Sequence, residues 1–552
     1  MIFVNPATVN KIQTGNADNT IYGIDGDNEI SDSGGNNSIF TGNGNDLIVT
    51  GAGNDFIYAG SGNNQIYAGD GNNLVYTTEG NDLIVAGNGN DVIFAGHGNN
   101  QIYGGGGINQ IYSGDGNDLI VTESGNDFIY SGNGNDVIYS GGGNDYIHLG
   151  NGNKEIYAGD GNNTIYAGNG NKIIITEAGN DFIYVAEGRN EIYTGAGDDF
   201  IHGSNGNNEI YAGTGNNRIY LGNGNNIVVS DSGNDSIFVG NGNNKIYSGG
   251  GDDLIYTGNG NNIIYAYDGV NTIYTGAGND LIVTGVNNDS IYAGDGNNQI
   301  YVSDGRNFVY SGIGNDLIVA GIGDDVIFAG AGNNEIYGGA GANQVYSGDG
   351  NDLVVTDSGN DFIYTGDGKD MIFAGAGNDF IQVGNGYKEI YTGAGNKTIY
   401  SGNGNKIIIT DAGNDFIYAN AGDNQIYSGA GNDSIYTGAG NDVINAGVGV
   451  NTIFAGEGNN NIISSGIDTI HTGSGADIFW LYAGSGEATI TNFNVANDRI
   501  SLGSGLKFSD LIISQSNWDT TIAIRSGNAV DLLATLKWVQ PNSVTSNVFF
   551  FG

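Results

Sequence analysis

The sequence predicts an all-β protein built as a solenoid, in which many short parallel strands stack on one another. The first observation is composition: of 552 residues, 102 are Gly, 33 Tyr and 21 Phe, while only 2 are Pro and none is Cys. The second is a nine-residue unit that repeats in register from about Thr14 to about Asn460, in about 50 copies. A hydrophobic content of 38% opposes disorder, and the scarcity of Pro excludes collagen.

Each nine-residue unit combines a turn with a short strand. In residues 41–49 the segment Gly-Asn-Gly-Asn-Asp precedes Leu-Ile-Val, and in residues 50–58 Gly-Ala-Gly-Asn-Asp precedes Phe-Ile-Tyr. Gly adopts a positive φ without steric cost, and Asn or Asp tolerates it, so the first part favours a turn. The β-branched and aromatic residues of the second part favour a strand. A strand of three residues cannot bury its inward Ile alone, whereas stacked copies form a continuous Ile ladder.

The units resemble the glycine-rich nonapeptide GGxGxDxUx of the RTX proteins, the haemolysin-type calcium-binding family. Its bulky aliphatic U falls on Ile48, Ile57 and their equivalents, and the resemblance covers roughly four fifths of the chain. The family's first Gly is usually Thr, Ala or Ser here. The resemblance implies a right-handed parallel β-roll with two nonapeptides per coil, hence about 25 coils, and it implies Ca²⁺ as the cofactor.

A longer repeat is also present. Residues 87–184 closely match residues 321–418, an offset of 234 residues or 26 units, which indicates an internal duplication. Because 26 is even, both copies keep the same phase in a coil of two units. This spacing favours a two-unit coil over a three-unit coil.

The charge balance indicates that the protein's partners are cations. Asp and Glu number 60 against 15 Lys and Arg, which makes a formal net charge of -45. Such a chain repels nucleic acid phosphates and anionic lipid headgroups, so we expect no nucleic acid partner. No apolar run approaches the ~18 residues of a membrane span, so we expect no membrane insertion.

The sequence favours a protein that is not an enzyme. His97, His148, His202 and His471 lie in separate units, no H-E-x-x-H motif occurs, and Cys is absent, so neither a zinc protease nor a thiol enzyme is supported. Each Gly-x-Gly precedes a strand and not a helix, which opposes a dinucleotide-binding fingerprint. The repeats also begin almost at once, and we expect no catalytic domain ahead of them.

The sixth position of the unit offers columns of carboxylates. Calcium binds six to eight hard oxygens, and Gly-rich turns expose backbone carbonyls beside that position. Asp occurs there about 23 times, Asn about 22 times and Lys about 5 times. In a two-unit coil, residues 18 apart would stack, and an ion midway between turns ~4.8 Å apart would lie about 2.4 Å from each turn. We predict calcium where Asp stacks on Asp: Asp118/Asp136, Asp127/Asp145, Asp181/Asp199, Asp235/Asp253, Asp352/Asp370, Asp361/Asp379 and Asp415/Asp433.

Asn and Lys at the sixth position leave alternatives open. The Asn side chains would form either a ladder of hydrogen bonds from coil to coil or weak calcium ligands beside an Asp. Examples are Asn64, Asn73, Asn217, Asn226 and Asn298. Four Lys residues follow an Asp pair on one edge, and their ammonium groups would either replace an ion or be solvated at the surface. They are Lys154, Lys172, Lys388 and Lys406.

The ninth position would carry an outward row of aromatic rings, because the eighth-position Ile points inward. The row includes Tyr58, Tyr67, Tyr76, Tyr103 and Tyr112. An exposed aromatic surface suits self-association or an extracellular polysaccharide, while packing of the rings on one another needs no partner. On one edge an acid replaces the second-position Gly, where it would either bridge neighbouring molecules through calcium or be solvated. These acids are Glu123, Glu177, Asp231, Asp357 and Asp411.

The repeat boundaries predict three segments. They are an N-terminal end segment at 1–13, the β-roll at 14–477, and a small β-rich cap with a type I secretion signal at 478–552. Residues 488–502 resemble the I-x-x-F-x-x-x-x-D-x-I-x-L segment that follows the repeats in many RTX proteins. The apolar tail at 546–552 resembles the uncleaved C-terminal signals of that family, and residues 1–15 lack the long apolar stretch of a signal peptide. We therefore expect a secreted protein, extracellular or at the cell surface.

These features together predict a calcium-binding structural protein that assembles, laterally or end to end, into an extracellular filament, sheath or surface layer. Cyanobacterial surface proteins such as oscillin, which are built of similar nonapeptides, are the functional example that the sequence resembles. The alternative is a monomeric adhesin or polysaccharide-binding module that uses the Tyr faces.

Overall fold

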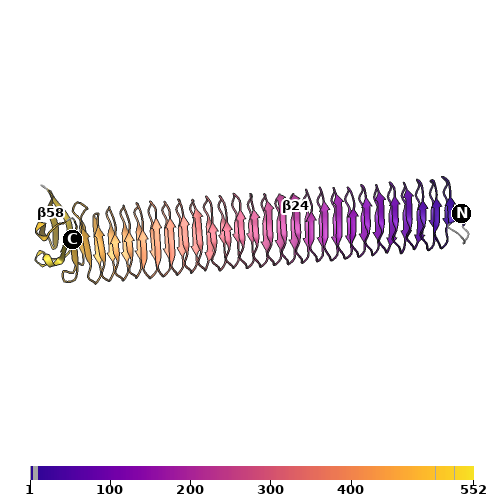
Figure 1. Ribbon diagram of the computed structural model, residues 1–552. Helices are drawn as coiled ribbons and strands as arrows, with labels where there is room; N and C mark the ends of the chain where they lie inside the picture. Colours follow the sequence, from indigo (N-terminus) through magenta and orange to yellow (C-terminus); the bar gives the residue numbers. More distant parts are fainter. Residues whose placement is uncertain (1, 4–9, 504, 527–528, 552) are drawn as a thin grey trace. The chain divides into compact units, whose positions relative to one another are not determined.

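The computed structural model describes residues 2–3, 10–503, 505–526 and 529–551. Most of the predicted end segment at 1–13 lies outside the described residues, as do residues 504, 527–528 and 552 of the predicted cap. The chain forms two compact units, Met1–Gly276 and Ala277–Gly552, and each is described by itself. Both units are all-β, and in Figure 1 the strands of each unit lie side by side as successive arrows joined by loops.

Within the first unit, odd-numbered strands form one parallel sheet, called sheet A, and even-numbered strands form a second, called sheet B. The strands of sheet A are β1 (Ile2–Phe3), β3 (Thr20–Tyr22), β5 (Ser38–Phe40), β7 (Phe56–Gly60), β9 (Leu74–Thr77), β11 (Val92–Gly96), β13 (Gln110–Ser113), β15 (Phe128–Ser131), β17 (Tyr146–Leu149), β19 (Thr164–Ala167), β21 (Phe182–Val185), β23 (Phe200–Gly203), β25 (Arg218–Leu221), β27 (Ser236–Val239), β29 (Leu254–Thr257) and β31 (Thr272–Tyr274). The strands of sheet B are β2 (Asn10–Gln13), β4 (Asn28–Ser31), β6 (Leu47–Val49), β8 (Gln65–Gly69), β10 (Leu83–Ala86), β12 (Gln101–Gly105), β14 (Leu119–Thr122), β16 (Asp136–Tyr139), β18 (Lys154–Gly159), β20 (Lys172–Thr176), β22 (Asn190–Tyr193), β24 (Glu209–Thr214), β26 (Ile227–Ser232), β28 (Lys245–Gly249) and β30 (Ile263–Ala266).

The second unit repeats this arrangement, again with odd strands in one parallel sheet and even strands in the other. Its odd parallel strands are β33 (Ser290–Tyr292), β35 (Phe308–Tyr310), β37 (Val326–Gly330), β39 (Gln344–Ser347), β41 (Phe362–Thr365), β43 (Phe380–Val383), β45 (Thr398–Ser401), β47 (Phe416–Ala419), β49 (Ser434–Thr437), β51 (Thr452–Ala455), β53 (Asp468–Thr472) and β55 (Ala488–Thr491). Its even strands are β32 (Leu281–Thr284), β34 (Gln299–Tyr301), β36 (Leu317–Val319), β38 (Glu335–Gly339), β40 (Leu353–Thr356), β42 (Asp370–Ala374), β44 (Lys388–Thr392), β46 (Lys406–Ile409), β48 (Gln425–Tyr427), β50 (Val443–Asn445), β52 (Asn461–Ser464), β54 (Ile478–Leu481), β56 (Arg499–Leu502) and β60 (Phe549–Phe551).

The strand register shows that two nine-residue units make one coil. Strand β6 pairs with β8 so that Ile48 faces Ile66, and β7 pairs with β9 so that Ile57 faces Val75, an offset of 18 residues in both sheets. The eighth-position side chains are fully buried, including Ile48 and Ile57 at 0% exposure. They form the Ile ladder that the period predicts. The predicted fold class, an all-β parallel solenoid with two units per coil, is confirmed.

The turns require Gly where neighbouring coils come closest. At the fourth position Gly71 has φ +135°, a conformation that L side chains rarely adopt, and an added Cβ would lie 1.9 Å from the carbonyl oxygen of Gly53 in the preceding coil. A side chain at that position would therefore push two coils apart. The high Gly content of the sequence therefore permits the close stacking of coils as well as the turns themselves.

Near the end of the second unit the strand pattern changes. Strands β57 (Leu511–Ser516), β58 (Asp519–Ser526) and β59 (Ala529–Leu536) pair antiparallel, and β59 also pairs in parallel with β55 while β60 pairs with β56. Three short 3-10 helices occur here, η1 (Phe508–Asp510), η2 (Pro541–Ser543) and η3 (Ser546–Val548). Among the described residues, no helix has the length and apolar character needed to cross a bilayer.

Candidate metal centres

The sixth-position side chains are buried inside the turns. Asp46, Asp91 and Asp145 are each at most 1% exposed. One carboxylate oxygen, Oδ1, accepts the backbone N–H of the sixth-position residue one coil earlier, as when Asn28 donates to Asp46 over 2.8 Å. The turn therefore places a carboxylate inside the protein, with one of its oxygens already used to join two coils.

The structure brings together the two members of every predicted Asp pair, each pair within one unit. In all seven pairs the backbone N–H of the first Asp donates to Oδ1 of the second over 2.8–3.1 Å. The pairs are Asp118/Asp136, Asp127/Asp145, Asp181/Asp199, Asp235/Asp253, Asp352/Asp370, Asp361/Asp379 and Asp415/Asp433. Calcium at these carboxylates stays a proposal, which is taken up below.

The second carboxylate oxygen, Oδ2, separates most of the sixth-position aspartates into two groups; Asp379, whose Oδ2 accepts from Lys397, belongs to neither. In the first group Oδ2 is buried and no described donor bonds it with good geometry; we call these the open aspartates. They are Asp46, Asp55, Asp82, Asp91, Asp127, Asp145, Asp181, Asp199, Asp253, Asp325, Asp361 and Asp442. A Ser or Thr hydroxyl five residues earlier still lies close enough to lower the pKa of most of them, as Thr122 does for Asp127, whereas Asp91 and Asp325 have no such hydroxyl. In the second group a Ser or Thr five residues earlier donates to Oδ2, as Ser113 does to Asp118 over 2.5 Å and Ser428 does to Asp433 over 2.7 Å.

Six of the open aspartates were missed by the sequence prediction, because it required Asp to stack on Asp. They are Asp46, Asp55, Asp82, Asp91, Asp325 and Asp442. Their neighbours in the column are Asn residues, for example Asn28 and Asn64 around Asp46. A simpler criterion, any Asp at the sixth position regardless of the residue that stacks on it, would have identified them.

The Asn turns show which other atoms face the sixth position. Asn73 Nδ2 donates to the carbonyl oxygens of Gly69 and Gly71, both over 3.1 Å, which are the second and fourth residues of its own turn. Asn73 Oδ1 accepts the backbone N–H of Asp55 over 3.1 Å. The predicted Asn ladder is therefore present in the structure. In an Asp turn the same two carbonyls meet a carboxylate in place of an amide donor.

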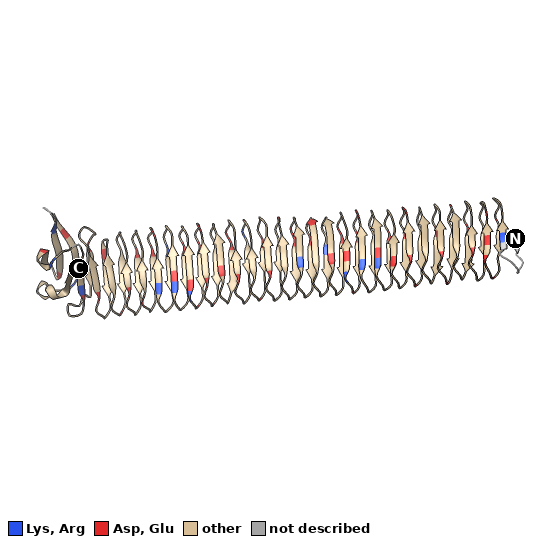
Figure 2. Cartoon of the chain, in the orientation of Figure 1, with Lys and Arg blue, Asp and Glu red and all other residues tan. Residues whose placement is uncertain are grey.

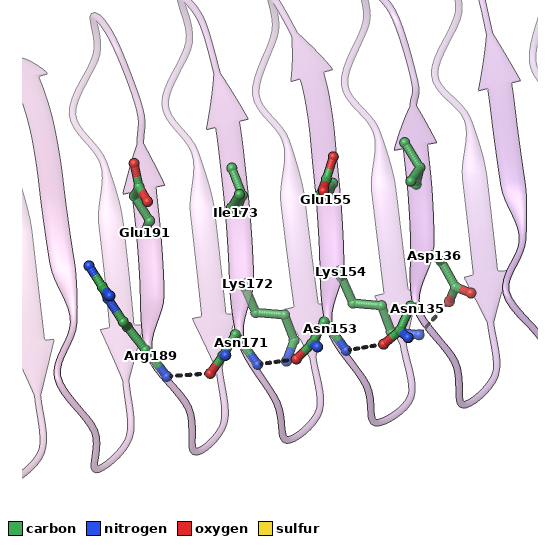
Figure 3. A pocket seen from close by; sticks show the side chains of 11 residues that line it. Asn135, Asp136, Asn153, Lys154, Glu155, Asn171, Lys172, Ile173, Arg189 and Glu191 are labelled. Atoms are coloured by element: carbon green, nitrogen blue, oxygen red, sulfur yellow. Dashed lines mark hydrogen bonds and ion pairs between the residues drawn. The ribbon is translucent and has the colours of Figure 1, made fainter.

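Three turns hold a lysine ammonium at this place. Lys397 Nζ lies 2.5 Å from the carbonyl oxygen of Gly377, 2.8 Å from Asp379 Oδ2 and 3.3 Å from the carbonyl oxygen of Gly375. Lys154 contacts Asp136 Oδ2 in the same way, as Figure 3 shows, and Lys388 contacts Asp370 Oδ2. A cation thus fits against the second-position carbonyl, the fourth-position carbonyl and the carboxylate of one turn.

The lysines at the sixth position are all buried. Lys154, Lys172, Lys388 and Lys406 are at most 1% exposed, so the alternative that they are solvated at the surface is wrong. Lys397 is equally buried and was missed by the sequence prediction, which considered only one edge. A lysine on a turn normally favours solvent. Here Lys154, Lys388 and Lys397 reach carbonyls of the preceding coil, whereas the other two bond carbonyls of their own turns.

Burial of the carboxylates raises their pKa values. The pKa rises from 3.8 to about 7 for Asp199 and Asp253, and to about 6 for Asp91, Asp145 and Asp325, in each case chiefly because burial penalises the charged form. The ionised columns are therefore unfavourable at neutral pH unless a cation compensates them.

A bound metal in these turns would draw most of its ligands from the backbone. In the described part of the chain, no group of three or more His, Cys, Asp or Glu side chains gathers with metal-binding geometry. One or two carboxylates with several carbonyl oxygens form an all-oxygen set, which suits calcium and does not suit zinc or copper. The lysine contacts show that three of the described turns accept an ammonium cation, and the open Oδ2 atoms provide the same type of acceptor in other turns.

The Asn ladder predicts a stability effect that does not depend on metal. Replacing Asn244 by Leu removes its bonds to the carbonyls of Gly240 and Gly242, both 3.1 Å, and the acceptor for the N–H of Asn226. Five polar groups lose a partner, because Asn226 Nδ2 also donates to Asn244 Oδ1 and Asn244 Nδ2 donates to Asn262 Oδ1. We expect a loss of about 3 kcal/mol or more in the free energy of unfolding. Urea unfolding with and without calcium measures it. The exposed Asn243→Leu is the matched control, with a loss of about 1 kcal/mol or less expected.

Many of the outward aromatic residues stack in short runs, chiefly in the sheet of odd-numbered strands, whereas Tyr58, Tyr67 and Tyr103 are 36–39% exposed. In the first unit Tyr76 and Phe94 stack with centroids 4.6 Å apart and planes 4° apart, and Phe94 and Tyr112 continue the stack at 4.7 Å and 6°. In such a stack each ring covers the face of its neighbour. The alternative in which the rings pack on one another is therefore present in the structure. The second-position acids are exposed at the turns.

A family model for the RTX calcium-binding nonapeptide repeat matches most of the chain. The matched residues are 13–48, 22–57, 40–75, 76–111, 112–147, 141–174, 148–183, 175–210, 193–228, 202–237, 229–264, 247–282, 256–291, 283–318, 310–345, 319–354, 346–381, 389–417, 400–435, 427–462 and 464–486. No curated protein is significantly similar in sequence to the chain. The matched stretches include the columns of sixth-position Asp in both units.

Proposed function

Because the chain belongs to the family of proteins with RTX calcium-binding nonapeptide repeats, we propose that it is a secreted structural protein whose fold is held by calcium. In this proposal the protein assembles into an extracellular filament, sheath or surface layer. The observation that carries the proposal is the set of open aspartates, whose buried oxygens face Gly-rich turns without a well-placed donor. Export before folding, by a type I route, fits this chemistry because metal-dependent folding would begin where calcium is plentiful.

We assign the calcium ions first to the open aspartates. Each would contribute Oδ2, and the second- and fourth-position carbonyls of the same turn would contribute further oxygens. Calcium bound there would neutralise the buried charge. Among the predicted residues, Asp118, Asp235, Asp352, Asp415 and Asp433 stay in the proposal, because an oxygen that accepts one hydroxyl bond keeps a second lone pair.

The aromatic stacks support a structural role over polysaccharide binding. A sugar ring stacks on the open face of an aromatic ring, and in the stacked runs these faces are covered by the neighbouring rings. What the rings present outward is their edges and hydroxyls. The monomeric adhesin therefore has less support than the structural protein.

An apolar group on one turn edge of the second unit supports self-association. Val448, Val450 and Ile467 are 58–59% exposed, and the backbone N–H of Ile467 donates to the carbonyl of Gly449 over 2.7 Å, so the three residues lie on neighbouring turns. We call them the apolar turn patch. Exposed apolar groups that gather on one surface mark interaction sites.

Electron microscopy of the purified protein in calcium tests assembly. We expect ordered assemblies from the natural sequence, and few or none from a variant with Val448, Val450 and Ile467 all changed to Ser. Ile108→Ser in the first unit is the control, because Ile108 is also exposed on a turn but has Asn90 and Asn126 as its column neighbours. If the natural protein stays monodisperse at high concentration with calcium, the adhesin is favoured and assembly is disproved.

A further inference from the structure

In turns of each unit a lysine ammonium contacts the sixth-position carboxylate and the second-position carbonyl; we call this position the cation place. Figure 2 shows that Lys and Arg gather on a few neighbouring strands in each unit and are sparse elsewhere. Three of these lysines bond a buried carboxylate: Lys154 with Asp136, Lys388 with Asp370 and Lys397 with Asp379, all with 0% exposure of both side chains. Such fully buried ion pairs require that both charges be compensated locally.

Of these three lysines, Lys397 has the largest number of oxygen contacts at the cation place. Its ammonium contacts Asp379 Oδ2, the carbonyls of Gly375 and Gly377 in the same turn as that Asp, and the carbonyl of Ala394 in its own turn at 3.3 Å. Four oxygens from two neighbouring turns therefore surround one positive charge. A calcium ion and this ammonium cannot occupy the place together, because they would overlap and repel each other.

The internal duplication supplies a natural comparison. Residue 163 corresponds to residue 397 at the offset of 234, and it is Asn in the first copy. There Asn163 donates to Gly159 and Gly161 of its own turn over 3.2 and 3.0 Å, and no described donor bonds the Oδ2 of Asp145 in the preceding coil with good geometry. The turns at 140–145 and 158–163 differ from those at 374–379 and 392–397 at five positions, including Ser140, which is Ala374 in the second copy. Residue 163/397 is the only difference at the sixth position, and it decides whether an ammonium reaches the carboxylate.

We propose that Lys154, Lys388 and Lys397 are built-in substitutes for calcium, which keep the turns of Asp136, Asp370 and Asp379 closed to the metal and folded without it. The proposal rests on the proposed calcium binding of the other turns. It revises our assignment for these three aspartates, which the sequence analysis counted as calcium ligands. Each unit would therefore contain a segment whose stacking survives calcium removal.

Lys172 and Lys406 extend these segments by one coil. Lys172 stacks beside Lys154 and donates to the carbonyl of Gly170 in its own turn over 2.6 Å, and Lys406 does the same with Gly404 beside Lys388. Neither forms an ion pair in the described structure, since the residue one coil earlier is Lys and not Asp. The turns of Lys172 and Lys406 have no sixth-position carboxylate for calcium, and an ammonium bonds a carbonyl of each turn.

A reciprocal exchange tests the proposal on the full chain. Lys397→Asn copies the first half of the duplication and should open Asp379, so that the chain binds one more calcium ion than the natural protein. Asn163→Lys copies the second half and should close Asp145, so that the chain binds one fewer. Native mass spectrometry counts the ions. Lys245→Asn is the control, because Lys245 is exposed on β28 and its removal should leave the count unchanged.

Hydrogen exchange gives a local readout of the same exchange. In the natural protein, amides of residues 375–400 should keep their protection when calcium is removed, and in Lys397→Asn their protection should become calcium-dependent. The proposal is overturned if the natural protein binds calcium but Lys397→Asn neither adds an ion nor changes this protection. If the natural protein binds no calcium at all, the proposed function fails instead, and the two failures are thereby distinguished.

Discussion

Removal of calcium at pH 7.5 is expected to unfold most of both units. The open aspartates would then carry charges in buried columns, and the pKa of about 7 for Asp199 and Asp253 shows how strongly burial opposes ionisation there. One pKa unit corresponds to about 1.4 kcal/mol, so each such group costs several kcal/mol above pH 7. Asp199 and Asp253 both lie in the first unit, and together their cost is comparable with the 5–15 kcal/mol that typically holds a domain.

Circular dichroism and thermal melting of calcium-loaded and calcium-stripped protein measure the effect. We expect loss of most β-structure, or a fall of tens of degrees in Tm, when calcium is removed. Asp199→Asn is a matched variant, because it introduces the residue found at 217, the next position of the same column. It should make the protein less dependent on calcium. A stripped protein with unchanged β-content and Tm would contradict this prediction.

The calcium-stripped protein is expected to gain stability when the pH is lowered from about 7.5 to about 5. The folded pKa values of about 6 to 7 at Asp91, Asp145, Asp199 and Asp253 lie above the unfolded value of 3.8, so the folded state binds protons more readily. The stability due to these groups is fully present below about 3.8 and is lost as the pH rises through 6 to 7. Protonation thus neutralises part of the buried carboxylate charge that calcium would otherwise neutralise.

The calcium-loaded protein should respond to pH in the opposite direction, because protons compete with the metal for the same oxygens. Tm measured against pH for both forms should give curves that approach each other toward pH 5. The lysines act outside this window: burial, together with the neighbouring lysine, lowers the pKa of Lys172 and Lys406 to about 8. A stripped protein whose Tm falls steadily on acidification would disprove the assignment of buried carboxylates as the calcium-sensitive groups.

The fold could be predicted because a single short period controls it. A nine-residue unit with one inward Ile permits only a stacked arrangement, and the 18-residue register that places Ile48 against Ile66 follows from two units per coil. The stacking of Asp181 on Asp199 follows from the same register. The hydrogen-bond partner of each turn side chain could not be predicted, because a side chain at a given position has more than one partner within reach.

The hydroxyl at the first position of the unit illustrates this limit. Ser113 donates to Asp118 Oδ2, whereas Thr122 donates to the carbonyl of Ser140 and leaves Asp127 Oδ2 open. Both residues stand five positions before an Asp, and they differ in which acceptor the hydroxyl bonds. Lys397 was missed because the prediction considered only the lysines of the other edge, and for those lysines burial itself was left open. The average tendency of lysine is to be solvated, and its burial depends on an oxygen set that two coils form together.

A crystal structure of the calcium-loaded protein, with anomalous scattering used to locate the metal, tests the central claim most directly. The account predicts calcium beside the Oδ2 atoms of the open aspartates, such as Asp127, Asp145 and Asp181, and a lysine nitrogen without calcium beside Asp379. Two results would contradict this claim: open aspartates without calcium beside them, or a calcium ion at the position of the Lys397 ammonium.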